Sequence, residues 1–288
     1  MSSTSKVAAT KRRGVPINIG ITGLWRHRQT LRVLVQRDLA VKYQKTVMGY
    51  FWSLLEPMGM AAIYWFIFGV VYGGSTRAGV PHDVSYGLYV VTGIFAWMWA
   101  SSAMSESTSS LTSQTSLITT MRVPREVFPV ARVFARFAEF LAGIPIIVVF
   151  AIFGGGTFGW HLVFLPLAVI IQATLLTGIS FILASLNVLY RDVQRFMRLA
   201  TRILFYSIPT IYPLYRVLHA QSMPNWVKAV YQINPYVGIM QLHHEAWIPG
   251  LNLLNWKMVV TSAAISVVVL FLGRWVFYRL EPSVLKEL

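Results

Sequence analysis

The stretch LVFLPLAVIIQATLLTGISFILASLNVL, residues 162–189, has no charged side chain in 28 residues. A helix rises 1.5 Å per residue, so about 20 apolar residues cross the roughly 30 Å of membrane hydrocarbon. This stretch is therefore long enough to span a membrane. Five further apolar stretches flank it and complete six predicted spans: residues 50–72, 86–104, 137–153, 199–218 and 259–278.

Composition agrees with an all-α membrane protein. The chain is 56% hydrophobic and 12% charged, whereas soluble domains carry about 25% charged residues. Its net charge of +15 would suggest nucleic acid in a soluble protein. Here the basic residues flank the spans, so we expect anionic lipids and an acidic protein surface as partners, and no nucleic acid. The absence of cysteine excludes disulfides and Cys-ligated metals.

The distribution of basic residues orients the spans. Of the 25 Lys and Arg residues, 21 fall on one alternating set of connections and four on the other: Arg77, Arg216, Lys228 and Lys257. Positive charge is retained on the cytoplasmic side of a membrane. We therefore expect both termini inside the cell.

The region before the first span divides in two. Residues 1–23 are polar and basic and are expected to form a disordered tail. Residues 24–49 hold a predicted amphipathic helix, 24–44, on the inner membrane surface. Asp38 and Lys42 interrupt its apolar side, and docking on a partner protein is the alternative. No cleavable hydrophobic region precedes the first span, so a signal peptide is not expected.

Two connections carry predicted short helices. Residues 116–121 can form one or two turns on the inner side, where a soluble partner would reach them. The long outer connection holds two helices near 224–233 and 235–247, because Pro224 and Pro235 suit first helical turns and Asn234 suits a cap. Their apolar side chains predict re-entrant elements in the outer leaflet. Pro209 and Pro213 predict a kink in the fifth span.

Catalytic and nucleotide-binding motifs are missing from the chain. It contains no Gly-Lys dipeptide and hence no P-loop, and neither HExxH nor Gly-x-Ser-x-Gly occurs. His243 and His244 are adjacent and point to different helix faces, so we expect no metal site there. The sequence thus gives no sign that the chain uses ATP or performs catalysis itself.

Acidic residues within the spans are few and lie near their cytoplasmic ends. They are Glu56 and Glu139. Arg136 precedes Glu139 by three residues, so these two can pair on one helix face. One interpretation is a structural ion pair. The other is a polar ring at a cytoplasmic entrance, which would also include Arg37.

Aromatic residues are dense in the first two spans. Trp65, Phe68 and Tyr72 share a helix face, and Tyr89 and Trp97 continue the pattern in the second span. Lipid packing and interfacial anchoring explain most such residues. Alternatively, they form a wall on which sugar rings slide, because aromatic faces stack on sugars without fixing one position.

Several segments together resemble a known family. They are RDL at 37–39, KY at 42–43, GYFWSLLEP at 49–57, MRVPR at 121–125, FP at 128–129, NVLYRDV at 187–193, SIPTIYP at 207–213 and INP at 233–235. Their order and spacing resemble the ABC-2 type permeases of bacterial exporters for O-antigen, capsule, teichoic acid and galactan. The resemblance runs from about residue 31 to residue 247 and implies that residues 50–288 form a six-helix transmembrane domain.

That resemblance implies partners and roles that spacing alone does not. The permease would form a homodimer in the bacterial cytoplasmic membrane, with two separate ATPase subunits that bind ATP and Mg. A glycan on polyprenyl diphosphate would pass between the permease copies, and the helix 24–44 would gate the entrance. The implied ATPase-coupling residues are Leu117, Met121, Arg122, Val123, Pro124, Arg125, Arg191 and Asp192. The implied outer gate comprises Trp226, Tyr231, Pro235, Tyr236 and Met240.

Two other functions stay open at this point. An ABC-2 permease for a lipid or drug would share the fold and the ATPase. A membrane-embedded enzyme that modifies glycans or lipids would need a cluster of carboxylates or histidines facing one compartment, and the sequence offers none.

Overall fold

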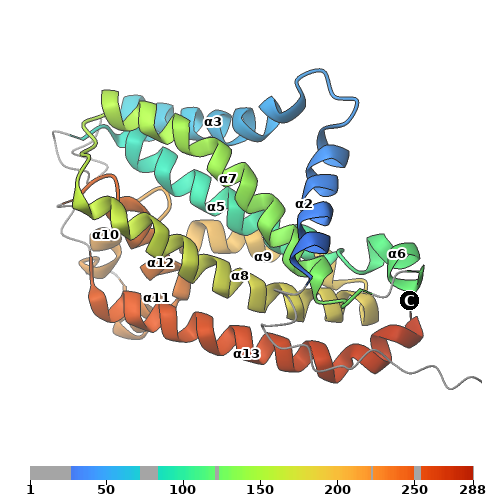
Figure 1. Cartoon of the computed structure of the whole chain (residues 1–288). Coiled ribbons are helices and arrows are strands. Elements are labelled where there is room, and N and C mark those ends of the chain that lie inside the picture. Colours follow the sequence, from blue (N-terminus) through green and yellow to red (C-terminus); the bar gives the residue numbers. More distant parts are fainter. Residues whose placement is uncertain (1–26, 72–83, 121–122, 222, 250–253, 288) are drawn as a thin grey trace, which may run out of the picture.

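A computed structural model describes residues 27–71, 84–120, 123–221, 223–249 and 254–287. All regular structure in these ranges is helical, as predicted. Four helical segments are long and apolar enough to cross a membrane: Tyr86–Thr108 (α5), Val127–Phe153 (α7), Trp160–Leu189 and Trp256–Glu287 (α13). The third segment consists of the 3₁₀ turn η4 (Trp160–Val163) and α8 (Phe164–Leu189). Figure 1 shows the four running roughly alongside one another. The chain is therefore an integral membrane protein.

The other two predicted spans are short or broken helices. Residues 50–72 begin with a 3₁₀ turn, η1 (Gly49–Phe51), and continue as α3 (Trp52–Trp65) and a π-helix, η2 (Phe66–Val71). The prediction of one continuous span at 199–218 is wrong in its limits, because α9 covers Val193–Ser207 and α10 covers Leu214–Leu218. Ile208 is extended, with φ −122° and ψ 154°, as a residue before proline prefers. The kink expected at Pro209 and Pro213 is therefore a complete interruption.

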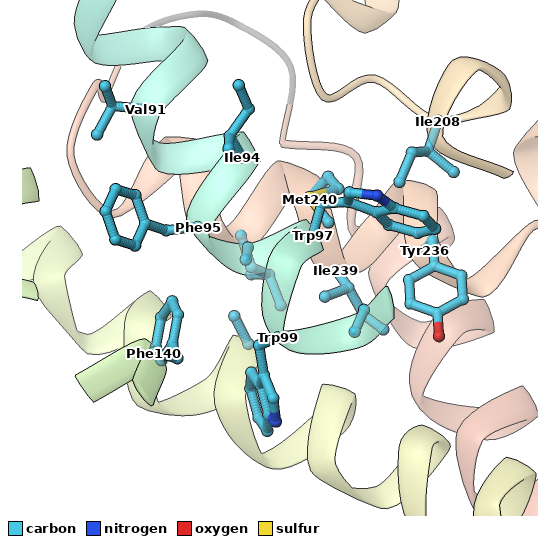
Figure 2. Close-up of a cluster of buried hydrophobic side chains, with 14 of the residues drawn as sticks. Val91, Ile94, Phe95, Trp97, Trp99, Phe140, Ile208, Tyr236, Ile239 and Met240 are labelled. Carbon is cyan, nitrogen blue, oxygen red and sulfur yellow. The ribbon is translucent and has the colours of Figure 1, made fainter. Parts of the chain in front are cut away.

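Helix α5 is the centre of the bundle and α13 lies at its rim. In the apolar part of α5, 83% of residues are buried, against 22% in α13. In Figure 2, Trp97 of α5 lies beside Tyr236 and Met240, while Trp99 faces Phe140 of α7. The Trp99 and Phe140 rings are stacked with centroids 5.4 Å apart. A single aromatic core thus joins segments that are distant in sequence.

Two glycines allow α8 and α13 to touch through their backbones. A Cβ atom added to Gly273 would overlap the carbonyl oxygen of Gly178. Small residues permit this approach between membrane helices, where van der Waals contact drives association. Any larger side chain at this point would separate the two helices.

The predicted outer helices form a hairpin, α11 (Asn225–Ile233) and α12 (Pro235–Glu245). Asn234 caps α12 as expected, its side chain accepting a hydrogen bond from the Tyr236 amide at 3.0 Å. No residue of α11 is buried, whereas α12 is almost wholly buried.

Contacts along α5 give the direction of α12. Near its start, the Tyr236 hydroxyl donates to the Met104 sulfur at 3.5 Å, in the C-terminal half of α5. We call this end of the bundle inner and the opposite end outer, after the orientation that the sequence predicts. Near its end, a His244 ring nitrogen lies 3.1 Å from the carbonyl oxygen of Tyr89, in the outer half. Helix α12 therefore runs from the C-terminal half of α5 back toward its start. That the hairpin is re-entrant in a membrane stays a prediction.

The predicted N-terminal helix is α2 (Arg28–Tyr43). Residues 24–26 of the predicted range and the predicted tail 1–23 lie outside the described residues. Figure 1 shows α2 running across the ends of the bundle helices. Its buried Leu34 packs in a cluster with Ile118 and Phe128. At the same end lie the 3₁₀ turn η3 (Thr112–Gln114) and α6 (Thr115–Thr120), the short helix expected at 116–121.

Candidate functional site

An ion-pair network joins α2 to the ends of α5 and α7. We call it the inner ion-pair cluster, and it consists of Asp38, Lys42, Glu106, Arg132, Arg136 and Glu139. Arg132 Nε lies 3.3 Å from Asp38 Oδ2, and Arg136 Nε lies 3.1 Å from Glu106 Oε2. Lys42 Nζ lies 3.1 Å from Glu139 Oε1. Three acidic and three basic side chains thus nearly neutralise one another at the inner end.

Arg136 and Glu139 are the most enclosed members of the inner ion-pair cluster. The Arg136 side chain is 1% exposed, and it pairs with Glu139 three residues later, as the sequence predicted. The Tyr43 hydroxyl donates to the same carboxylate. Burial, followed by this hydrogen bond to Glu139, raises the pKa of Tyr43 well above its usual value. The phenol therefore stays protonated and acts as a donor that ties the end of α2 to α7.

The predicted entrance residues meet around two adjoining cavities. Glu56, Arg136 and Glu139 line a cavity of about 30 Å³. Arg37 and Arg136 line a larger cavity of about 580 Å³, bounded by α2, α5, α6 and α7. The structure thus brings the four residues to one region, where ion pairing accounts for Arg136 and Glu139. An entrance role for them stays a prediction.

Sequence reasoning missed four members of the inner ion-pair cluster. Asp38 and Lys42 stood out only as interruptions of an apolar helix face, yet they are the residues that dock that face onto α7. Their spacing of four was the available signal, because it places both on one side of a helix. Glu106 and Arg132 had no such signal, since their partners lie on other helices.

The predicted ATPase-coupling residues lie at the same end as α2. Leu117 is half-buried in α6, Val123 and Pro124 are half-buried, and Arg125 pairs with Glu281 of α13. Arg191 and Asp192 are exposed in the turn after α8. The Asn187 side chain donates to the Thr112 hydroxyl at 3.5 Å, which places that turn beside the segment leading to α6. Met121 and Arg122 lie outside the described residues.

Glu126 is a buried carboxyl group next to these residues. It precedes α7 and is 4% exposed, and its Oε1 has no hydrogen-bond partner among the described residues. Burial raises the pKa of Glu126 to about 7, with attraction to Arg274 opposing the shift and repulsion from Glu281 adding to it. The inner end of the bundle therefore contains one carboxyl group that titrates near neutral pH.

The predicted path residues lie in different environments. Trp65 is 47% exposed and lines an apolar cavity of about 470 Å³ between α3 and the outer ends of α5 and α7. Tyr89 is buried, and its hydroxyl donates to the carbonyl oxygens of Pro209 and Tyr212, both at 2.9 Å. Trp97 is buried against Phe205 and Tyr236. Packing within the subunit explains Tyr89 and Trp97, and their place on a path stays a prediction without a supporting contact.

The remaining two predicted path residues are Phe68 and Tyr72. Tyr72 lies outside the described residues, and the side chain of Phe68 is likewise not described. The shared face expected for them with Trp65 therefore stays a prediction.

The predicted outer-gate residues range from the exposed Trp226 through the half-buried Tyr231 to a buried pair. Trp226 is 70% exposed on α11, and the Tyr231 hydroxyl donates to the Tyr212 hydroxyl at 3.4 Å. Pro235 starts α12. Tyr236 and Met240 are buried beside Trp97 (Figure 2). A gate would therefore have α11 as its accessible surface, while α12 anchors it in the core.

The two adjacent histidines of α12 bond to different helices. A His243 ring nitrogen lies 2.9 Å from Gln172 Oε1 of α8, and Gln172 donates in turn to the Ala96 carbonyl oxygen. The His244 ring stacks on Tyr89 with centroids 4.0 Å apart. Among the described residues, no three His, Cys, Asp or Glu side chains could hold a metal ion together. The histidines thus fasten α12 to α5 and α8.

Similarity to known proteins covers most of the chain. The family described as ABC-2 type transporter matches residues 29–242. The O-antigen export system permease protein RfbA of Klebsiella pneumoniae is 29% identical over 252 residues, which are 87% of this chain and 92% of that protein. RfbA of Myxococcus xanthus is 28% identical over 88% of this chain and 93% of its own length. The polysialic acid transport protein KpsM of Escherichia coli is 23% identical over 89% of this chain and 95% of its own length.

Proposed function

The chain belongs to the ABC-2 type transporter family, and from that premise we propose that it is the permease subunit of an ATP-driven polysaccharide exporter. The substrate would be a glycan carried on polyprenyl diphosphate, moved across the bacterial cytoplasmic membrane. The observation that carries this proposal is near full-length similarity to proteins named for O-antigen export and polysialic acid transport. The same family serves other substrates, so the test must discriminate among them.

The proposed topology has six crossings with both termini inside. Four crossings are the long apolar helices. The first and fifth would be α3 with η2, and α9 with the segment up to α10, because each starts at the end of the bundle where α2 lies. The charge bias of 21 basic residues to four supports this orientation.

ATP hydrolysis is assigned to separate subunits that bind ATP and Mg. The absence of any Gly-Lys dipeptide leaves this chain without a P-loop lysine. We propose a dimer of this chain with two ATPases docked on the inner end. The contact region would be α6 and the exposed turn at Arg191 and Asp192. The Asn187–Thr112 hydrogen bond places this turn beside the segment leading to α6, and Ile118 of α6 packs in a cluster with Leu34 of α2.

In this proposal, motion of the ATPase reaches the bundle through two connections. Arg125 ties the segment after α6 to Glu281 of α13. The inner ion-pair cluster ties α2 to α5 and α7. A displacement of α6 would therefore move α13 directly, and α2 would follow through its contacts with Ile118.

The central test reconstitutes the chain with its cognate ABC ATPase in vesicles and supplies ATP. We expect ATP-dependent transfer of polyprenyl-diphosphate-linked glycan into the lumen. Transfer of simple lipids or drugs with no glycan transfer would instead identify the other ABC-2 class. Modification of a glycan or lipid by the purified chain alone, without any ATPase, would support the enzyme hypothesis.

The coupling surface has its own test. Arg191→Glu should lower substrate-stimulated ATPase activity of the complex while the permease stays folded, because Arg191 is exposed and its reversal disturbs no internal pair. Lys257→Glu, also exposed but at the start of α13 on the proposed outer side, is the matched control. Equal coupling in both variants would remove Arg191 from the contact region.

A further inference from the structure

Helix α9 carries a row of arginines on one face. Arg195, Arg198 and Arg202 follow one another at intervals of three and four, and Arg191 lies four residues before the first, in the turn that precedes α9. All four side chains are exposed. From the first to the last, the row extends about 16 Å along the helix axis. We call these four residues the arginine row.

The arginine row is almost unneutralised. Arg195 lies 3.6 Å from Asp192, in a pair whose side chains are 80% and 90% exposed. No carboxylate of the described residues lies within ion-pair distance of Arg198 or Arg202. The arginines of the inner ion-pair cluster, by contrast, have carboxylate partners. The positive charge of α9 is therefore available to an anion from outside the subunit.

The far end of the row reaches well inside the length of the bundle. Phe205, one turn after Arg202, packs against Trp97, which is halfway along α5. The Tyr206 hydroxyl lies 3.4 Å from that of Tyr64 in α3. Ionisable residues at such depth are costly against lipid, and they generally face a water-filled cavity or a bound ion. The exposed face of α9 is thus more compatible with a polar path than with hydrocarbon.

A second exposed row on α9 is apolar. Phe196, Leu199, Ile203 and Tyr206 repeat at intervals of three and four, and each side chain is more than half exposed. At 100° per residue this row lies about a quarter turn from the arginine row. One helix therefore presents a basic strip and an apolar strip side by side. That pair of surfaces fits an amphiphile with a long hydrocarbon chain and an anionic head.

We propose that the three arginines of the row that lie within α9, Arg195, Arg198 and Arg202, bind the diphosphate group of the lipid-linked substrate, while the polyprenyl chain lies along the apolar row. This inference rests on the proposed export function. Guanidinium groups form paired hydrogen bonds with phosphate oxygens. Arg198 and Arg202 are neighbours on the helix surface, so both can reach one diphosphate. Ordinary phospholipid heads stay at the interface, near Arg191, and would leave the deeper arginines without an anion.

The test measures binding to the full chain in nanodiscs of phosphatidylcholine. The probes are polyprenyl diphosphate, polyprenyl monophosphate, uncharged polyprenol and phosphatidylglycerol. We expect the diphosphate to bind most tightly and polyprenol least. The double variant Arg198→Gln/Arg202→Gln should raise the Kd for the diphosphate about a hundredfold, since each arginine that no longer bonds to phosphate accounts for about tenfold. Arg198→Lys/Arg202→Lys should recover part of that affinity.

The matched control is Arg279→Gln/Lys286→Gln, which removes two exposed charges from the end of α13 and should leave the Kd unchanged. An unchanged Kd in the Arg198/Arg202 variant overturns the proposal, as does equal binding of polyprenol or phosphatidylglycerol by the unmodified chain. The last two measurements decide the matter even if the double variant fails to fold.

Failure of this inference is distinguishable from failure of the proposed function. If the unmodified chain and its ATPase export glycan while the arginine variant binds diphosphate normally, only the arginine row is excluded. If the unmodified complex does not export glycan at all, the function itself is excluded.

Discussion

Replacement of Arg136 by Gln tests whether the inner ion-pair cluster holds α2 on the bundle. The Arg136 side chain is 1% exposed and pairs with Glu139 and Glu106, which are 13% and 30% exposed. The change removes a buried charge and leaves both carboxylates with fewer partners. Glu139 keeps Lys42 and the Tyr43 hydroxyl, and Glu106 keeps longer contacts to Lys42 and Arg132.

The expected destabilisation follows from these remaining contacts. Removing one partner of a buried ion pair typically costs about 3–5 kcal/mol, because an uncompensated charge stays behind. The surviving partners of Glu139 and the exposure of Glu106 place this case near the lower limit, at about 3 kcal/mol. For a chain of this size, that corresponds to a decrease of about 6–12 °C in Tm.

Thermal unfolding of the purified chain in detergent measures this destabilisation, and a double-mutant cycle isolates the pair. Glu139→Gln and the combined variant complete the cycle, and the combined destabilisation should fall short of the sum of the two single values by at least about 1 kcal/mol. Arg195→Gln is the control, since its pair with Asp192 is exposed and should contribute little. Additive values, or equal Tm values for Arg136→Gln and Arg195→Gln, would refute the reasoning.

Three further substitutions test other contacts of the fold. Gly273→Val should prevent close packing of α8 and α13 and abolish recovery of folded protein on size-exclusion chromatography, whereas Gly59→Ala, with open space around it, should be tolerated. Tyr89→Phe should lower Tm through a destabilisation of about 1–3 kcal/mol, because two carbonyl oxygens at the α9–α10 break no longer have their donor; Tyr215→Phe, at an exposed site, is its control. The pKa of about 7 for Glu126 exceeds its usual value, so the native state favours the protonated form and loses stability as pH rises through 7. The free energy of unfolding should therefore decrease by about 2 kcal/mol between pH 5 and pH 8, after allowance for solvent screening. The Glu126→Gln variant should not show this decrease. A similar decrease in that variant would exclude Glu126 as its source.

The sequence predicted the helices best where one physical signal dominated. Long charge-free runs identified α8 and the other long helices, and Asn234-Pro235 identified the start of α12. The start of α9 was missed because hydropathy excludes residues such as Arg195 and Arg198 from an apolar span. Amphipathic periodicity would have included them, since Arg195, Arg198 and Arg202 repeat at intervals of three and four along the same helix.

Interactions between distant segments were harder to predict. The pair Arg136–Glu139 was predictable because its members lie three residues apart. Arg132–Asp38 was not, because its members lie 94 positions apart in the sequence and no local rule connects them. Tyr89 and Tyr236 show the same limit for aromatic residues: the sequence placed both at surfaces of a path or gate, while tertiary packing buries them. Residue type alone does not distinguish a ring that binds ligand from one that fills a core.

The hairpin of α11 and α12 has a consequence for biogenesis. Gly238 of α12 packs so closely on α13 that an added Cβ would overlap the Ser262 hydroxyl and lie 2.7 Å from the Met258 carbonyl oxygen. Because α13 follows α12 in the chain, α12 cannot reach its final position until α13 has also left the ribosome. Until then, polar groups such as His243 and Gln241 have to be sheltered by the insertion machinery or by water. The nascent chain is therefore expected to be most vulnerable to membrane quality-control proteases in the interval before α13 is inserted.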